Sequence, residues 1–150
     1  MNGLDPDAFL ADTWQQHPLL LRDAVPGFTD PLTPEELAGL ALEEGIESRL
    51  VTCGNGEWQL QHGPFGEADF QLQGPWTLLV QAVDHHVPGV AALRRLVDFL
   101  PVWRMDDVMV SYATAGGGVG PHYDNYDVFL LQGQGEREWH IGDACEADVD

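Results

Sequence analysis

The sequence contains no lysine, and all of its fixed positive side-chain charge comes from six arginines. Its 25 acidic residues give a formal net charge of -19. A field of this sign repels nucleic-acid phosphates and anionic lipid, but it attracts a basic polypeptide in a salt-dependent way. We therefore expect no direct nucleic-acid binding and favour a basic protein partner. Solubility alone, or a compositional bias of the source, is an equally weighted explanation of the acidity.

Cysteines and long apolar runs are also scarce. Cys53 and Cys145 are far apart and form no C-x-x-C pair, so neither a disulfide framework nor a zinc knuckle is indicated, and both are interpreted as free thiols. No run of about 18 apolar residues predicts a membrane helix. The start, MNGLDPDAFL, lacks the basic and apolar regions of a signal peptide. We expect a cytoplasmic protein with no membrane partner.

The helix signals lie in the first two thirds of the chain. A length of 150 residues with 44% hydrophobic residues suits a single domain. Residues 5–16 open with Asp5 as an N-cap and Pro6 in the first turn, and the Thr33-Pro34-Glu35-Glu36 stretch fits a capping box. The sequence predicts helices over residues 5–16, 33–45 and 88–101.

Alternating apolar residues predict strands elsewhere. Residues 48–62 form two alternating segments around Gly54-Asn55-Gly56, which is a strong hairpin signal. The brief apolar run at 18–25 is a possible buried strand. Further strands are expected over residues 76–83, 107–113, 126–132 and 136–142. The pattern predicts an α+β protein that is mainly β, and the abrupt end after the last strand suggests part of a longer barrel protein.

The first candidate site is the triplet His122-Tyr123-Asp124. In an extended segment residues i and i+2 share a face, so His122 and Asp124 can offer an imidazole nitrogen and a carboxylate oxygen to one ion. A non-haem Fe(II) oxygenase uses such donors in a two-histidine, one-carboxylate triad. Chance alone would supply about 0.6 His-x-Asp triplets in this composition, so a surface turn or an internal hydrogen bond is an open alternative.

The residues around the triplet add to the case. The preceding run Gly116–Gly120 is followed by neither Gly-Lys-Ser/Thr nor a helix, so it fits neither a phosphate loop nor a dinucleotide fingerprint and suits the mouth of a barrel better. Arg137 lies on the expected last strand, where its guanidinium could bind a dicarboxylic co-substrate bidentately. A rim salt bridge with Glu136, Glu138 or a neighbouring strand is the alternative. The simple strand register places Arg137 on the other face from His122 and Asp124, so a bulge or a corner would have to correct the register.

The remaining histidines and the tryptophans are weaker candidates. His85 and His86 follow a strand and precede Pro88, which favours a loop role over metal ligation. His17, His62 and His140 have no partner at metal-ligand spacing. The five tryptophans are most simply core or interface anchors.

Four blocks of sequence resemble the bacterial ribosomal oxygenases, which are JmjC-type cupin proteins that hydroxylate an arginine of a large-subunit ribosomal protein. The blocks are DTWQQHPLLLR, LTPEELAGLALEEGIESRLV, WTLLVQAVDHHVPG and WRMDDVMVSYATAGGGVGPHYDNYDVFLLQGQGEREW. The resemblance implies a JmjC/cupin double-stranded β-helix, truncated and preceded by helices. Residues 1–150 would be one incomplete domain, with flanking helices and strands over about 1–105 and the first barrel strands over about 106–150.

The resemblance also implies roles for single residues. His122 and Asp124 would be Fe(II) ligands, and Arg137 would bind the distal carboxylate of 2-oxoglutarate, with O2 as the second co-substrate. The family's second histidine ligand and its dimerisation regions lie beyond residue 150, and His140 is too early to match that ligand. The isolated chain is therefore expected to bind Fe(II) weakly and to be inactive, as part of a cytoplasmic dioxygenase.

Two other classes of function stay open. The chain could be a non-catalytic acidic module that binds basic ribosomal proteins through the same fold. It could also be a cupin isomerase or dioxygenase that acts on a small molecule without 2-oxoglutarate.

Overall fold

The structure is a computed structural model that describes residues 1–142. The chain divides into two compact units, one formed by Pro31–Gly120 and the other by Met1–Asp30 together with the chain from Pro121 onward. The described elements are the helices α1 (Pro6–Asp12), α2 (Pro34–Leu40) and α3 (Pro88–Leu93), the strands β1 (Ser48–Gly54), β2 (Glu57–His62), β3 (Trp76–Val80) and β4 (Val110–Ala113), and four 3₁₀ turns at Glu67–Phe70, Val83–His85, Arg94–Val97 and Val102–Arg104.

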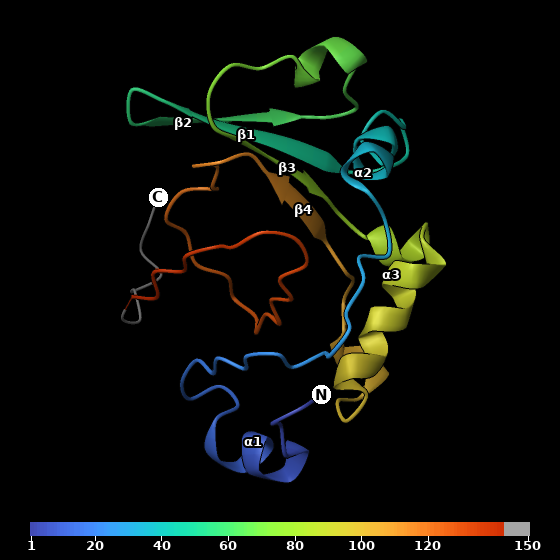
Figure 1. Ribbon diagram of the computed structural model, residues 1–150, viewed down its shortest axis with the longest axis vertical. Helices are drawn as coiled ribbons and strands as arrows, with labels where there is room; N and C mark the ends of the chain where they lie inside the picture. The colour runs from blue at the N-terminus through green and yellow to red at the C-terminus, as the bar shows by residue number, and fades with distance from the viewer. Residues whose placement is uncertain (143–150) are drawn as a thin grey trace. The chain divides into compact units, whose positions relative to one another are not determined.

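A four-stranded antiparallel sheet is the framework of the unit Pro31–Gly120. Its strand order is β2-β1-β3-β4, as Figure 1 shows. The hairpin between β1 and β2 turns at Asn55 and Gly56, whose φ angles of 54° and 82° are the left-handed values that such two-residue turns require. The Gly54-Asn55-Gly56 signal therefore predicted this hairpin correctly, and Cys53 pairs with Trp58 across it.

The core of this unit lies on one side of the sheet, beneath α2 and the start of α3. Leu50 on β1 and Leu78 on β3 are directly opposite in the antiparallel register and are both fully buried. Leu37 on α2 and Val90 on α3 join the same cluster. Truncating a buried leucine of this kind costs about 2–5 kcal/mol, so each of these side chains contributes substantially to the stability of the unit.

Local signals account for where α1 and α2 begin. Asp5 caps α1 by accepting hydrogen bonds from the backbone N–H groups of Asp7 and Ala8. The predicted capping box of α2 is present, because Thr33 and Glu36 each accept a hydrogen bond from the other's backbone N–H. Both helices are shorter than predicted, as is α3, which passes into a 3₁₀ turn at Arg94.

A buried ion pair holds the segment that leads into β4. Arg94 Nη1 lies 2.6 Å from Asp84 Oδ2, and Asp84 Oδ1 accepts the backbone N–H of Val108. Burial raises the pKa of the Asp84 carboxyl, but the hydrogen bonds from Val108 and Arg94 and the charges of Arg94 and His85 outweigh it, so the pKa lies below its ordinary value. Neighbouring His85 and His86 are exposed, as expected.

The other unit contains α1 and the segment that follows Pro121. Phe129 packs against two aromatic rings of the N-terminal region, with ring centroids 5.8 Å from Trp14 and 6.1 Å from Phe9. Gln15 Nε2 donates a 2.8 Å hydrogen bond to Asp127 Oδ2. Residues more than a hundred positions apart in the sequence are thereby brought together.

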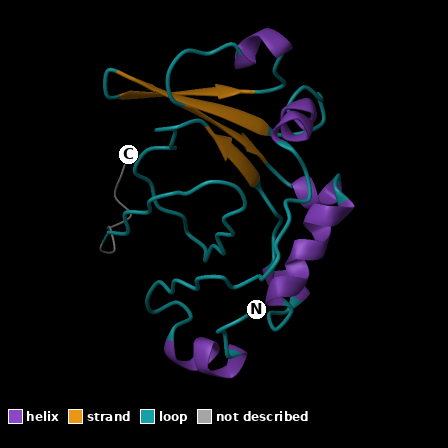
Figure 2. Cartoon of the chain, in the orientation of Figure 1, coloured by secondary structure: helices purple, strands orange, loops and turns teal. Residues whose placement is uncertain are grey.

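Several predicted strands are absent or shorter. Within residues 1–142 the structure has no strand over 18–25, 126–132 or 136–142, and Figure 2 shows these three stretches as loops. The strand predicted over 107–113 is confined to β4. A strand is stable only when a neighbouring backbone satisfies its N–H and C=O groups. Described residues offer the 126–132 stretch no such ladder, and Tyr126 and Leu130 are 71% and 60% exposed. These strand predictions were therefore wrong.

Candidate functional site

The glycine-rich segment after β4 is shaped by close approaches to the sheet. Gly117 donates its backbone N–H to Thr114 O, and a Cβ at this position would lie 2.5 Å from the carbonyl oxygen of Trp76. Gly120 has a φ of +79°, and a Cβ there would lie 3.2 Å from the indole ring of Trp58. Within this glycine-rich run, glycine is thus required sterically at positions 117 and 120.

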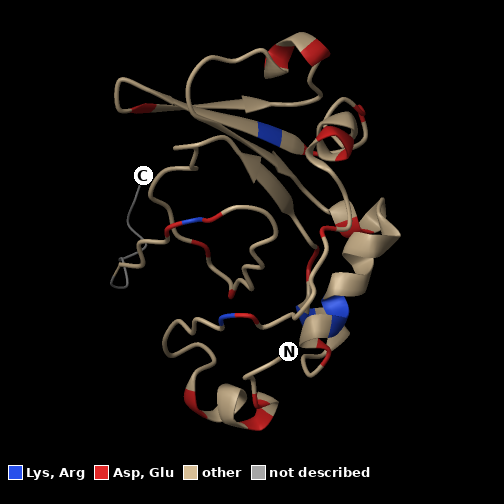
Figure 3. Cartoon of the chain, in the orientation of Figure 1, with Lys and Arg blue, Asp and Glu red and all other residues tan. Residues whose placement is uncertain are grey.

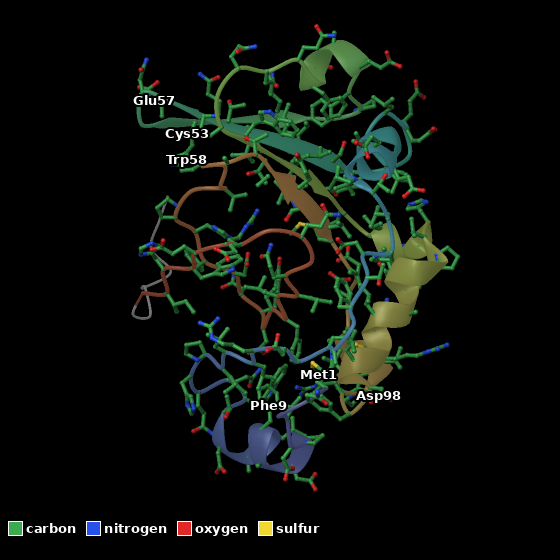
Figure 4. All side chains as sticks on the ribbon, in the orientation of Figure 1. Met1, Phe9, Cys53, Glu57, Trp58 and Asp98 are labelled. Carbon is green, nitrogen blue, oxygen red and sulfur yellow. The ribbon has the colours of Figure 1, made fainter. Side chains whose placement is uncertain are left out.

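Trp58 is a contact of this segment that the sequence did not reveal. Its ring lies on β2, next to the labelled Cys53 and Glu57 in Figure 4, and it faces the backbone of Gly118 and Gly120. The sequence treated all tryptophans alike as core or interface anchors. Glycines two positions apart, such as Gly118 and Gly120, indicate room for an aromatic ring. Nothing in the sequence specifies which ring fills that space.

His122 and Asp124 are brought together as predicted. His122 Nε2 lies 3.9 Å from Asp124 Oδ2, and the two side chains are 50% and 38% exposed. Nitrogen and oxygen ligands that bind one ion at about 2.1 Å in neighbouring positions are roughly 3 Å apart, so a small side-chain rotation would let both reach a single metal. The pair is accessible from solvent, and its donor atoms are about 1 Å further apart than they would be on one ion.

The donor set fits part of an iron site. Imidazole and carboxylate donors suit Fe(II) when further positions stay open for substrate. Among residues 1–142, no group of three or more His, Cys, Asp or Glu side chains could hold a metal ion. His122 and Asp124 are thus a pair of possible donors with no third such side chain beside them in this part of the chain.

Arg137 is held by an aromatic ring. Its guanidinium carbon lies 5.8 Å from the ring centroid of Trp139, within the range of a cation–π contact. The alternative salt bridge to Glu136 or Glu138 does not form within the described chain, and Glu138 instead lies 2.8 Å from His140 Nε2. The guanidinium is thus not bound to either neighbouring carboxylate.

The structure also bears on the expectations about the cysteines and about membrane-spanning helices. Cys53 is a free, half-buried thiol, whereas Cys145 lies outside the described residues. None of the helices in residues 1–142 has both the length and the apolar character needed to span a bilayer.

Comparison with known protein families shows the class to which the chain is similar. A match to the JmjC domain covers residues 92–150. The fold is α+β and mainly β, and the proteins with similar structures have the JmjC cupin fold, as the sequence predicted.

Comparison with individual curated proteins identifies more specific relatives of the chain. The chain is 50% identical over 141 residues to the ribosomal protein uL16 3-hydroxylase of Escherichia coli strain K12, covering 94% of this chain and 38% of that protein. It is 41% identical over 149 residues to a probable ribosomal oxygenase of Haemophilus influenzae, covering 98% of this chain and 37% of that protein. The chain thus spans somewhat more than a third of the length of these curated relatives. The predicted resemblance to the bacterial ribosomal oxygenases is confirmed over the part that the chain spans.

Solved structures of a bacterial ribosomal oxygenase are also similar to this chain. The E. coli ribosomal oxygenase YcfD in complex with cobalt and 2-oxoglutarate matches with a TM-score of 0.79 and 48% identity, covering 83% of this chain and 34% of that one. Its complex with cobalt and succinic acid matches with a TM-score of 0.76 at the same identity, covering 80% and 33%.

Proposed function

We propose that this chain is part of an Fe(II)- and 2-oxoglutarate-dependent hydroxylase that modifies an arginine of a large-subunit ribosomal protein. The observation that carries this proposal is the His122–Asp124 pair, with donor atoms 3.9 Å apart, in a chain that is 50% identical to a uL16 3-hydroxylase. The cobalt and 2-oxoglutarate bound by the YcfD structure support the same cofactor and co-substrate here.

Each candidate residue has a distinct role in this proposal. His122 and Asp124 donate a nitrogen and an oxygen to the iron, and Arg137 binds the distal carboxylate of 2-oxoglutarate. Trp139 stacks beneath that guanidinium and restricts its side-chain rotamers, so the fork is preorganised for a planar carboxylate. Bound iron would supply activation of O2, with 2-oxoglutarate as the reductant that becomes succinate.

The third iron ligand is proposed to come from a later barrel strand of the longer protein. Two donors in the described residues, and a chain that spans 38% of its relative, support this assignment. Residues 1–150 are then one incomplete JmjC domain, in which about 1–105 flank the barrel and about 106–150 begin it. Such a chain binds Fe(II) weakly and does not turn over, and dimerisation belongs to regions outside it.

The decisive experiment uses a protein extended to the full length of its relatives. With Fe(II), 2-oxoglutarate and O2, it is expected to form succinate and to add one oxygen atom to an arginine-containing ribosomal peptide, detected by mass spectrometry. His122→Ala and Asp124→Ala should abolish both products because each removes a metal ligand. Arg137→Lys should raise the KM for 2-oxoglutarate, because an ammonium cannot reproduce the bidentate contact. Absence of hydroxylated peptide from the iron-loaded protein would refute the proposal.

A second candidate is a non-catalytic acidic module that binds basic ribosomal proteins. It is favoured by the net charge of -19 and by the presence of only two metal donors together in residues 1–142. Unchanged peptide affinity in a His122→Ala, Asp124→Ala double variant, together with no turnover of 2-oxoglutarate by the extended protein, would select it. Turnover of a small molecule without 2-oxoglutarate would instead indicate another kind of cupin enzyme.

A further inference from the structure

The segment that carries the metal donors has little regular structure of its own. Residues 121–142 form no helix or strand in the described chain. His122 and Asp124 are both substantially exposed, and their donor atoms are 3.9 Å apart. Two ligands on a segment without regular structure lose conformational entropy when they close on an ion, so anything that orders the segment beforehand increases metal affinity.

The N-terminal region makes ordered contacts with this same segment. Trp14 stacks on Phe129 with an interplanar angle of 23° and a centroid distance of 5.8 Å, and Phe9 lies edge-on to Trp14 at 5.7 Å. Offset stacking and edge-to-face contacts are the favourable arrangements of aromatic rings. Phe9 lies on α1, as labelled in Figure 4, so the cluster connects the helix to the donor segment five residues after Asp124.

A polar contact lies beside this cluster. Gln15 has a φ of 59°, a left-handed conformation that is uncommon for a residue with a side chain. Its amide donates a 2.8 Å hydrogen bond to Asp127, only three residues after Asp124. Donation to a carboxylate is stronger than donation to a neutral acceptor, and this contact fixes the segment at a second point.

We propose that Phe9, Trp14 and Gln15 are positioning residues for the metal site, because they hold Phe129 and Asp127 and so restrict the segment that carries His122 and Asp124. The inference rests on the proposed metal-binding role of that pair. It assigns a function to α1 and the residues just after it: removal of these contacts weakens metal binding even where the chain remains folded.

The test measures Co(II) binding to the protein extended to the full length of its relatives by calorimetric titration, together with amide hydrogen exchange of residues 122–129 in the metal-free protein. Trp14→Ala is expected to weaken Co(II) binding about tenfold and Gln15→Ala about threefold, with faster exchange in both, because the donor segment is less ordered before binding. Trp14→Phe should restore most of the affinity because it keeps an aromatic ring against Phe129.

Matched controls separate this effect from general destabilisation. Trp103→Ala removes a tryptophan that is 78% exposed, and Gln16→Ala removes an amide that donates to the nearby Ala11 carbonyl. Both controls should leave Co(II) affinity and exchange of residues 122–129 unchanged. Equal weakening by the controls, or unchanged affinity in both Trp14→Ala and Gln15→Ala, would overturn the positioning role.

His122→Ala distinguishes failure of this inference from failure of the proposed function. Loss of Co(II) binding in His122→Ala, with unaltered binding in Trp14→Ala and Gln15→Ala, leaves the metal site intact and refutes only the positioning role. Co(II) binding that is insensitive to His122→Ala refutes the metal site itself, and the positioning role with it.

Discussion

The Asp84 carboxyl makes the stability of the unit Pro31–Gly120 dependent on pH. Its pKa in the folded protein is below the ordinary value of 3.8. The stability that this group contributes is therefore complete above the ordinary value and is lost as the pH falls through the folded pKa. We expect Asp84→Asn to lower the free energy of unfolding by about 2 kcal/mol at neutral pH, because Arg94 loses its charged partner.

Urea denaturation at a series of pH values checks this expectation. The difference between Asp84→Asn and the unsubstituted chain should begin to shrink below about pH 4, where the carboxyl becomes protonated in the unfolded state, and should be smallest once the pH is also below the lower pKa of the folded state. Asp98→Asn, at an exposed carboxyl labelled in Figure 4, is the matched control and should change stability by less than about 0.5 kcal/mol. A difference that is constant over the whole pH range would contradict the assignment.

Gly120 is the glycine whose replacement should have the clearest effect. Gly120→Ala combines a φ of +79° with a Cβ 3.2 Å from the Trp58 ring, and it is expected to destabilise the chain by about 2 kcal/mol. Urea denaturation measures the change. A Cβ at Gly45 would meet nothing within 4 Å, so Gly45→Ala is the control and should be close to neutral. Equal stability of the two variants would show that the Trp58 contact is not maintained in solution.

At the scale of single elements, the α2 capping box is the most directly testable feature. Thr33→Ala removes the side-chain oxygen that accepts the Glu36 N–H at 3.2 Å. We expect a loss of about 1 kcal/mol in the free energy of unfolding, because one backbone donor at the helix start is left without its cap. Glu35→Ala, in the same turn but outside the box, should cost less. Thermal denaturation followed by circular dichroism measures the change. An unchanged Tm of Thr33→Ala would contradict this prediction.

The success of sequence-based prediction follows from how local each signal is. The Asp5 cap, the Thr33–Glu36 capping box and the Asn55-Gly56 turn each involve residues within four positions of one another in the sequence. All three were predicted correctly. His122 and Asp124 also lie within one local repeat of an extended chain, so their proximity was predictable. Whether they bind iron is still a prediction, as is the role of Arg137.

Features that depend on distant partners were missed. The strands predicted over 126–132 and 136–142 have suitable alternation, but a strand also needs a paired backbone, which a local pattern cannot supply. The contact of Trp58 with Gly120 and that of Trp14 with Phe129 join residues 62 and 115 positions apart. Side-chain type shows that each aromatic ring needs a partner, and only the fold shows which partner it has.

At the scale of the whole molecule, the dominant property is charge. Carboxylates are spread along the helices and loops of both units, whereas the arginines are few (Figure 3). With a net charge of -19, encounter with a basic peptide should be accelerated by long-range attraction, and salt should weaken that attraction by shortening the Debye length.

The association rate constant with an arginine-rich ribosomal peptide is therefore expected to fall roughly tenfold between about 30 mM and 300 mM NaCl, while the dissociation rate changes much less. Stopped-flow fluorescence with a labelled peptide measures both rates. A peptide of the same length with its arginines replaced by glutamine is the control, and its slow association should be nearly independent of salt. Because steering depends on the summed field, replacing one exposed carboxylate such as Asp98 should change the rate only slightly. An association rate that does not depend on salt would show that the acidity serves solubility and not recognition.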